Sequence, residues 1–299
     1  IDWASLPLAG MAAMWTGGMP RQTNFVGRDG DVYVLDVGAP LRLEPAEVAL
    51  PSNAGQARNQ GYALQWWIFA AAAVAATVAA QLRAYLHELQ KDPHKIVQLC
   101  LTGGRVANDV YGQLAAAGPG EVDWGRVEFW WGDERFLPAG DPDRNAGQSL
   151  GLLAGGLPVD RARVHPMPAA STNGECNFIN ATQHYAEELS DTTFDLCLLG
   201  VGEDGHVASL FPGHPSFEPT TTRKVVGVLE APKPPPARLS LTLPVINAST
   251  QVWLIVAGTD KAEATARALS GDDSLPAGAV AARERTVWFL DEEAAAGLI

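Results

Sequence analysis

The stretch GVGEDGH, residues 200–206, places a histidine directly after three closely spaced glycines. Their spacing matches a dinucleotide-binding turn, but such a turn opens a helix and needs an acidic residue about 20 residues further on. Here His206 and a short segment that ends at Pro212 follow instead. An imidazole can accept a proton from water at neutral pH. We therefore predict that His206 is a general base, with Asp204 orienting the ring or setting the polarity of the site; a helix-capping histidine is the alternative.

Two further stretches place charged residues or glycines where a strand ends. In WWGDERFLP, Asp133 could shuttle a proton or position substrate hydroxyls, and Arg135 could bind a phosphate through two parallel hydrogen bonds. In LTGGR, the turn at Gly103 and Gly104 offers backbone N–H groups at the start of a helix, which is a natural binding site for phosphate. Solvated loop charges and a plain tight turn are the alternatives for each stretch taken alone.

Basic residues at strand ends are informative because the chain as a whole is acidic, with a formal net charge of −13. An anionic substrate would therefore need a locally basic pocket. Arg105, Arg135, Arg238 and Lys261 all fall at predicted strand ends, although each of them alone could be a surface charge. The overall charge disfavours nucleic acid and anionic membranes as partners.

These residues need a scaffold that brings strand ends together, and the rhythm of the chain after Pro93 predicts one. Apolar strands such as KIVQLCLTGG, RVEFWWG, FDLCLLGVG, QVWLIVAG and TVWFL alternate with helical stretches. Such alternation predicts an α/β fold with a doubly wound, mainly parallel, Rossmann-like sheet covered on both faces. Ligands bind at the carboxyl ends of the strands in such sheets. We expect the three chemically unusual stretches to converge at that edge.

The N-terminal part has a different character. Residues 1–65 are predicted to be an extension of unclear origin, with one clear strand at Asp31–Val37, and residues 66–299 form the α/β domain. One long helix is expected from Trp66 to Gln90. Its uncharged first half leaves two possibilities open, a helix buried against the sheet, which is favoured, or a membrane segment through residues 66–80. The segment QGYALQWWIFA resembles the juxtamembrane end and second membrane helix of the Surf-one family of cytochrome-oxidase assembly proteins.

From residue 74 to the end, the chain resembles the 6-phosphogluconolactonase family, relatives of glucosamine-6-phosphate deaminase. The resemblance rests on four motifs in order: VEFWWGDERFLPAGDPDRNAGQS, FDLCLLGVGEDGHVASLFPG, ARLSLTLPVINAS with VAGTDKAEA, and LPAGAVAARERTVWFLDEEAA. It implies hydrolysis of 6-phospho-D-glucono-1,5-lactone to 6-phosphogluconate in the oxidative pentose phosphate pathway. The alternatives are a non-catalytic sugar-phosphate-binding or assembly protein, and a glucosamine-6-phosphate deaminase, which the ASLFPG continuation disfavours.

The resemblance also implies roles for individual residues. His206 becomes the base, with Asp204 and Asp133 as catalytic partners. Phosphate binding is assigned to a set of glycines and basic residues, namely Gly103, Gly104, Arg105, Arg135, Arg238 and Lys261. Two positions depart from the family pattern, since Arg105 replaces a small polar residue and Arg144 stands in a stretch that usually reads Asp-Ser-Asn. They raise the question whether phosphate binding is altered.

The remaining expectations concern partners and location. No cofactor and no metal site is predicted, and the three cysteines are interpreted as core thiols of a reducing compartment. The only partner expected is the small-molecule sugar-phosphate lactone. The chain is predicted to be cytoplasmic and to be a monomer or a small homo-oligomer.

Overall fold

The structure, a computed structural model, describes residues 21–27, 30–36, 54–171 and 178–298. Its centre is a seven-stranded sheet in the order β1-β2-β10-β9-β6-β3-β4. The strands of this sheet are β1 (Arg21–Gly27), β2 (Gly30–Asp36), β3 (Val97–Leu101), β4 (Val127–Trp131), β6 (Leu196–Gly200), β9 (Gln251–Val256) and β10 (Arg285–Asp291). All neighbours pair in parallel except β1 and β2, which form a hairpin. The predicted α/β fold with a mainly parallel sheet is confirmed.

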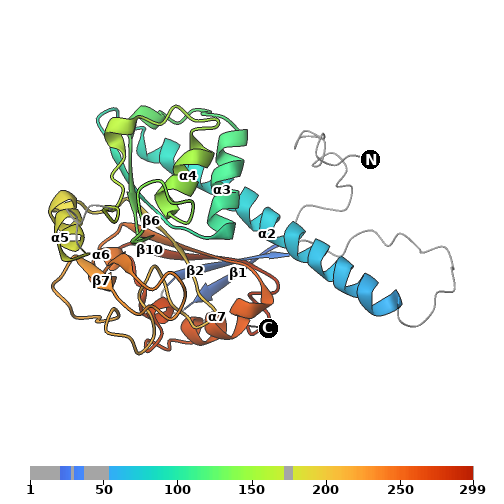
Figure 1. The fold of residues 1–299 in the computed structure, drawn as a ribbon. Helices are drawn as coiled ribbons and strands as arrows, with labels where there is room; N and C mark the ends of the chain where they lie inside the picture. The colour runs from blue at the N-terminus through green and yellow to red at the C-terminus, as the bar shows by residue number, and fades with distance from the viewer. Residues whose placement is uncertain (1–20, 28–29, 37–53, 172–177, 299) are drawn as a thin grey trace.

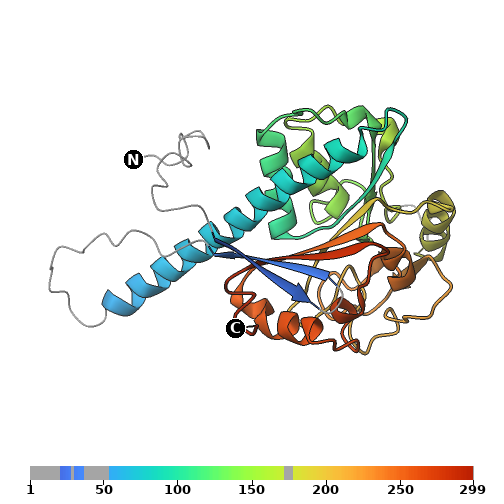
Figure 2. The ribbon, with the colours of Figure 1, turned by 180° about the vertical axis from the view of Figure 1, so that it is seen from behind.

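The central strands are continuous apolar runs because both faces of the sheet are covered. One face packs against α2 (Ala54–Leu89), α3 (Arg105–Ala116) and α4 (Asn145–Leu153), and the other against α5 (Phe178–Leu189), α6 (Leu243–Asn247) and α7 (Ala262–Leu269). Figures 1 and 2 show the helices on the two sides of the sheet. Cys100 and Cys197 lie opposite each other on β3 and β6, buried in this core, and Cys176 lies outside the described residues.

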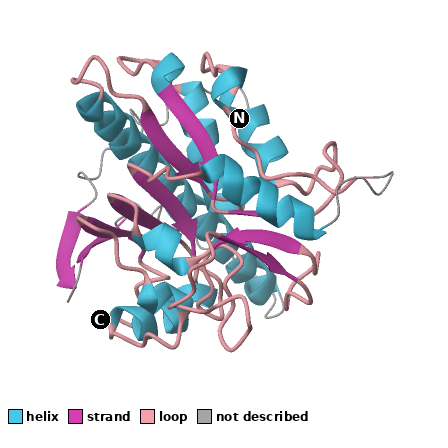
Figure 3. Ribbon diagram, turned by 90° about the vertical axis from the view of Figure 1, so that its left-hand side faces the viewer, coloured by secondary structure: helices cyan, strands magenta, loops and turns pink. Residues whose placement is uncertain are grey.

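A second, three-stranded antiparallel sheet lies beside the first, in the order β5-β8-β7. Its strands are β5 (Asp133–Arg135), β7 (Val225–Val228) and β8 (Arg238–Leu241). The chain passes from one sheet to the other at Gly132, whose N–H donates to the carbonyl of Leu101 while its own carbonyl accepts from the N–H of Leu241. The charged end of β4 was expected at the rim of a single sheet. It instead turns into this second sheet. Figure 3 shows the strands in magenta and the helices around them in cyan.

The helix α2 begins at Ala54, twelve residues before the predicted start at Trp66. A helix interior accepts one glycine at a cost of about 1 kcal/mol, so Gly61 does not end it. The strand predicted at Asp31–Val37 is β2, and it pairs in parallel with β10 on the side of β10 that faces away from β9. None of the helices in the described ranges is long and apolar enough to cross a membrane. Because α2 begins at Ala54, the division expected at residue 65 falls within this helix.

Candidate active site

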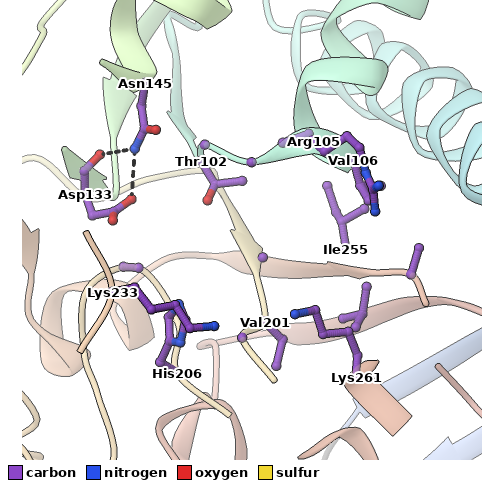
Figure 4. Close-up of a pocket in the computed structure, with 18 of the residues that line it drawn as sticks. Thr102, Arg105, Val106, Asp133, Asn145, Val201, His206, Lys233, Ile255 and Lys261 are labelled. Carbon is purple, nitrogen blue, oxygen red and sulfur yellow. Dashed lines mark hydrogen bonds between the residues drawn. The ribbon is translucent and has the colours of Figure 1, made fainter. Parts of the chain in front are cut away.

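A pocket of about 790 Å³ opens at the carboxyl ends of the central strands. Volumes of this size accommodate small metabolites. Its wall is built by the turns after β3, β4, β6 and β9 together with the segment before β8 (Figure 4). All but one of the predicted site residues line it, namely Gly103, Gly104, Arg105, Asp133, Arg135, His206, Arg238 and Lys261. The exception, Asp204, contacts the pocket residue His206. The three stretches expected to converge do lie around one cavity.

The loop after β6 holds His206 in place through close backbone packing. The N–H of Gly202 donates to the carbonyl of His206 at 2.9 Å, and a Cβ at Gly202 would lie 2.0 Å from the Nδ1 atom of His206. Gly205 adopts a φ of 82°, which favours glycine. The glycines of this motif therefore fold the chain tightly around an imidazole, as predicted in place of a dinucleotide turn.

Asp204 fixes the orientation of the imidazole. Its Oδ1 atom lies 2.5 Å from Nδ1 of His206. Burial raises the pKa of Asp204, but the hydrogen bond and the charge of His206 outweigh this effect and lower the pKa to about 2. An ionised carboxylate only accepts hydrogen bonds, so in the neutral form of the imidazole Nδ1 carries the proton and Nε2 has the lone pair. The His206 side chain is 16% exposed, which gives the imidazole limited contact with solvent.

On the opposite wall, Asp133 is buried and its carboxylate is held by two side chains. Ser209 Oγ donates to Oδ2 at 2.7 Å, and Asn145 Nδ2 donates to Oδ1 at 3.2 Å and to the Asp133 carbonyl at 3.0 Å. Asn145 lines the pocket as well. It was not among the predicted site residues, because nothing in the local sequence DRNAGQ indicates that the side chain reaches across to Asp133.

Arg144, which departs from the family pattern, does not line the pocket but supports residues that do. Arg144 is buried, lies 3.6 Å from Oε2 of Glu134, and donates to the carbonyl of Met167 at 2.6 Å. Glu134 accepts the N–H groups of Arg135, Asn145 and Ala146. Burial raises the pKa of Glu134, and these N–H donors together with Arg144 partly offset the rise. The pair thereby ties β5 to the beginning of α4, which carries Asn145.

Five basic side chains line the pocket, and four of them belong to the predicted set. Arg105 lies at the first turn of α3, and Lys261 lies across the cavity at the start of α7 (Figure 4). Lys261 forms an ion pair with Asp260 at 3.0 Å. Arg135 donates from Nη1 to the carbonyl of Asp143. This gathering supplies the local positive charge that an anionic ligand needs in an acidic protein.

The fifth basic residue, Lys233, was missed by the sequence analysis. It lies in the proline-rich segment before β8 and pairs with Glu203 at 3.0 Å. Arg238 shapes this segment, because its guanidinium donates to the carbonyls of Lys233, Pro234 and Pro235. Burial lowers the pKa of Arg238, partly offset by the charge of Asp133. Arg238 was predicted as a phosphate ligand, and the structure gives it this additional role of holding Lys233 at the rim.

The arrangement can support hydrolysis of an anionic substrate. It combines an oriented imidazole, a buried carboxylate and a cationic rim around one cavity. The backbone N–H groups at the beginning of α3 add donors, and the N-cap residue Gly104 has no side chain to cap them. Within the described ranges, no group of three or more histidine, cysteine, aspartate or glutamate side chains is placed to hold a metal ion.

Comparison with known proteins agrees with this geometry. The sequence model of the family described as glucosamine-6-phosphate isomerases/6-phosphogluconolactonase matches residues 70–288. A 6-phosphogluconolactonase of Streptomyces coelicolor is 47% identical over 211 residues, which cover 66% of this chain and 80% of that protein. One of Mycobacterium leprae is 40% identical over 208 residues, covering 66% and 83%. The crystal structure of a 6-phosphogluconolactonase of Thermotoga maritima, 28% identical, superposes with a TM-score of 0.63 over 73% of this chain and 94% of that one.

Proposed function

The chain belongs to the glucosamine-6-phosphate isomerase/6-phosphogluconolactonase family, and from this premise we propose how it works. It is an enzyme that hydrolyses 6-phospho-D-glucono-1,5-lactone to 6-phosphogluconate, and His206 is the general base. The observation that carries the assignment of the base is the contact of 2.5 Å between Asp204 and Nδ1 of His206, on the wall of a pocket lined by basic residues.

The reaction begins with a water molecule next to Nε2 of His206. The imidazole takes a proton from this water as the oxygen attacks C1 of the lactone, and the carbonyl oxygen becomes an oxyanion. When the tetrahedral intermediate collapses, the bond between C1 and the ring oxygen breaks. The imidazolium returns its proton to that oxygen, which becomes the C5 hydroxyl of the open-chain acid. The negative charge of Asp204 stabilises the imidazolium between the two steps.

The phosphate of the substrate binds to the cationic rim and the N–H groups at the beginning of α3. Arg105 lies at this helix terminus, Lys261 faces it across the cavity, and Lys233 and Arg135 add positive charge around the opening. Because the phosphate is remote from C1, its binding energy holds the lactone carbonyl against His206. In this scheme, Arg105 supplies with its guanidinium the contact that a small polar residue makes in the family pattern.

The pentose phosphate pathway is the metabolic context that this reaction implies. We place the enzyme in the cytoplasm as a monomer or small homo-oligomer. The interpretation of the cysteines as core thiols of a reducing compartment supports the location.

The test of the proposed function is the rate of lactone hydrolysis with the full-length chain. The purified protein should accelerate hydrolysis of 6-phosphogluconolactone well above the spontaneous rate, and it should prefer this substrate strongly over unphosphorylated gluconolactone. Acid release at constant pH measures both reactions. A preparation that is folded but leaves the spontaneous rate unchanged would refute the proposal, and equal rates on both lactones would refute the role of the cationic rim.

A further inference from the structure

The Asn145 side chain carries a hydrogen-bond acceptor that the protein itself does not use. Asn145 is 2% exposed, and its Oδ1 atom has no hydrogen-bond partner among the described residues. An acceptor left unpaired in a buried place is costly, and beside a pocket a bound molecule is one explanation for it. Asn145 lines the pocket, where a bound molecule could supply the missing donor.

The neighbours of Asn145 fix the orientation of its amide. The Nδ2 atom lies 3.0 Å from the carbonyl oxygen of Asp133 and 3.2 Å from its Oδ1. Both of these atoms are acceptors, so the amide nitrogen must point toward them and the amide oxygen away. Ser209 holds the Asp133 carboxylate from its other side, at 2.7 Å. Figure 4 shows the amide oxygen of Asn145 turned away from Asp133.

The turn after β3 is shaped to admit this amide. A Cβ at Gly103 would lie 2.0 Å from Oδ1 of Asn145 and 2.4 Å from its Cγ, so residue 103 cannot carry a side chain while the amide stays in place. The N-terminus of α4 is held by Glu134, which accepts the N–H groups of Asn145 and Ala146 at 2.7 and 2.9 Å. The acceptor is therefore preorganised before any ligand binds.

We infer that Oδ1 of Asn145 accepts a hydrogen bond from a ring hydroxyl of the sugar and thereby contributes to substrate specificity. The inference rests on the proposed function and deepens it. The wall formed by Asp133 and Asn145 presents acceptors, so it selects a hydroxyl donor and disfavours a phosphate dianion, which has no proton to donate. The phosphate is thereby directed to the basic rim, and the sugar ring adopts one orientation in which C1 faces His206.

The test is a binding cycle with a ligand that cannot be hydrolysed. The parent probe is 1,5-anhydroglucitol 6-phosphate, a ring without the C1 carbonyl, and the series is completed by its 2-, 3- and 4-deoxy forms. Calorimetry on the full-length protein should show that one deoxy form binds about tenfold more weakly than the parent. Asn145→Ala should bind the parent about tenfold more weakly and should bind that deoxy form with no further loss. Asn108→Ala is the matched control, because Asn108 also has an unpaired Oδ1 but does not line the pocket.

Two results would overturn the inference. In the first, the loss of affinity from the parent probe to each deoxy form is the same for Asn145→Ala as for the unaltered protein. In the second, none of the three deoxy forms binds the unaltered protein more weakly than the parent does. The second comparison needs only the unaltered protein, so it holds even where the variant fails to fold. Turnover of the lactone by the same preparation tests the proposed function separately: a protein without turnover refutes that function, and a protein with turnover but no Asn145-dependent penalty refutes this inference alone.

Discussion

Replacing Gly103 with alanine is a single-methyl perturbation whose effect can be worked out from the structure. Gly103 lies in the turn between β3 and α3 and does not have the positive φ that favours glycine, so alanine would not strain the backbone there. The added Cβ would lie 2.0, 2.4 and 2.8 Å from Oδ1, Cγ and Nδ2 of Asn145. The amide must therefore leave its position and lose both hydrogen bonds to Asp133.

The magnitude follows from those two bonds. A bond to a neutral carbonyl contributes about 1 kcal/mol and one to an ionised carboxylate about 1.5–3 kcal/mol. We therefore expect Gly103→Ala to lower the free energy of unfolding by about 2–4 kcal/mol, and to lower kcat/KM for the lactone about 10- to 100-fold because the sugar loses its acceptor. Urea unfolding followed by tryptophan fluorescence measures the first effect, and acid release measures the second.

A matched control and a double variant test the reasoning further. Gly112→Ala, in the middle of α3, meets no atom within 4 Å, so it should leave activity unchanged and stabilise the helix by up to about 1 kcal/mol. Gly103→Ala combined with Asn145→Ala should cost little more than Asn145→Ala alone, because the clashing atoms are gone. Additive losses in the double variant, or a Gly103→Ala protein as stable and active as the unaltered one, would refute the described position of Asn145.

Three further outcomes are expected. Asp204→Asn should lower the free energy of unfolding by ~1 kcal/mol once solvent screening is allowed for. Because the folded pKa of about 2 lies below the unfolded value of about 3.9, this difference should persist from neutral pH to about pH 4 and disappear toward pH 2. Urea titrations measure it, and a difference that stays constant with pH would contradict the reasoning. Lys233→Ala should raise KM for the phosphorylated lactone about tenfold and leave the unphosphorylated one unchanged, with Lys224→Ala, outside the pocket, as control; equal changes on both lactones would exclude phosphate binding. Arg144→Met should cost about 3–5 kcal/mol of stability by leaving the buried Glu134 carboxylate without its charge partner, and thermal unfolding within a degree of the unaltered protein would contradict this.

Sequence patterns predicted the parts of the fold that depend on local composition and periodicity. The apolar strands ending at Leu101, Trp131 and Gly200 could be read as parallel because helices alternate with them, and parallel strands bring their carboxyl ends to one edge. The convergence of the glycine loop with the basic residues followed from that rule alone. The placement of His206 in the pocket was predictable because the glycines before it end a strand and are not followed by the helix of a dinucleotide-binding turn.

The features that were missed depend on contacts between distant parts of the chain. Asn145 acts through Asp133 and against Gly103, and Lys233 is held by Arg238 through the carbonyls of a proline segment. None of these contacts leaves a periodic or motif-like signal. The turn at Gly103 and Gly104 was predicted to offer backbone N–H groups to a phosphate; nothing in the sequence indicated that a side chain at position 103 would also collide with the amide of Asn145.

The most direct test of the central claim is the rate lost when the imidazole is removed. His206→Ala should lower kcat/KM for 6-phosphogluconolactone by about 10²- to 10⁴-fold, the usual contribution of a positioned general base. His184→Ala, on the surface of α5, should leave kcat/KM unchanged. A folded His206→Ala protein that retains kcat/KM within threefold of the unaltered enzyme would contradict the claim that His206 activates the attacking water.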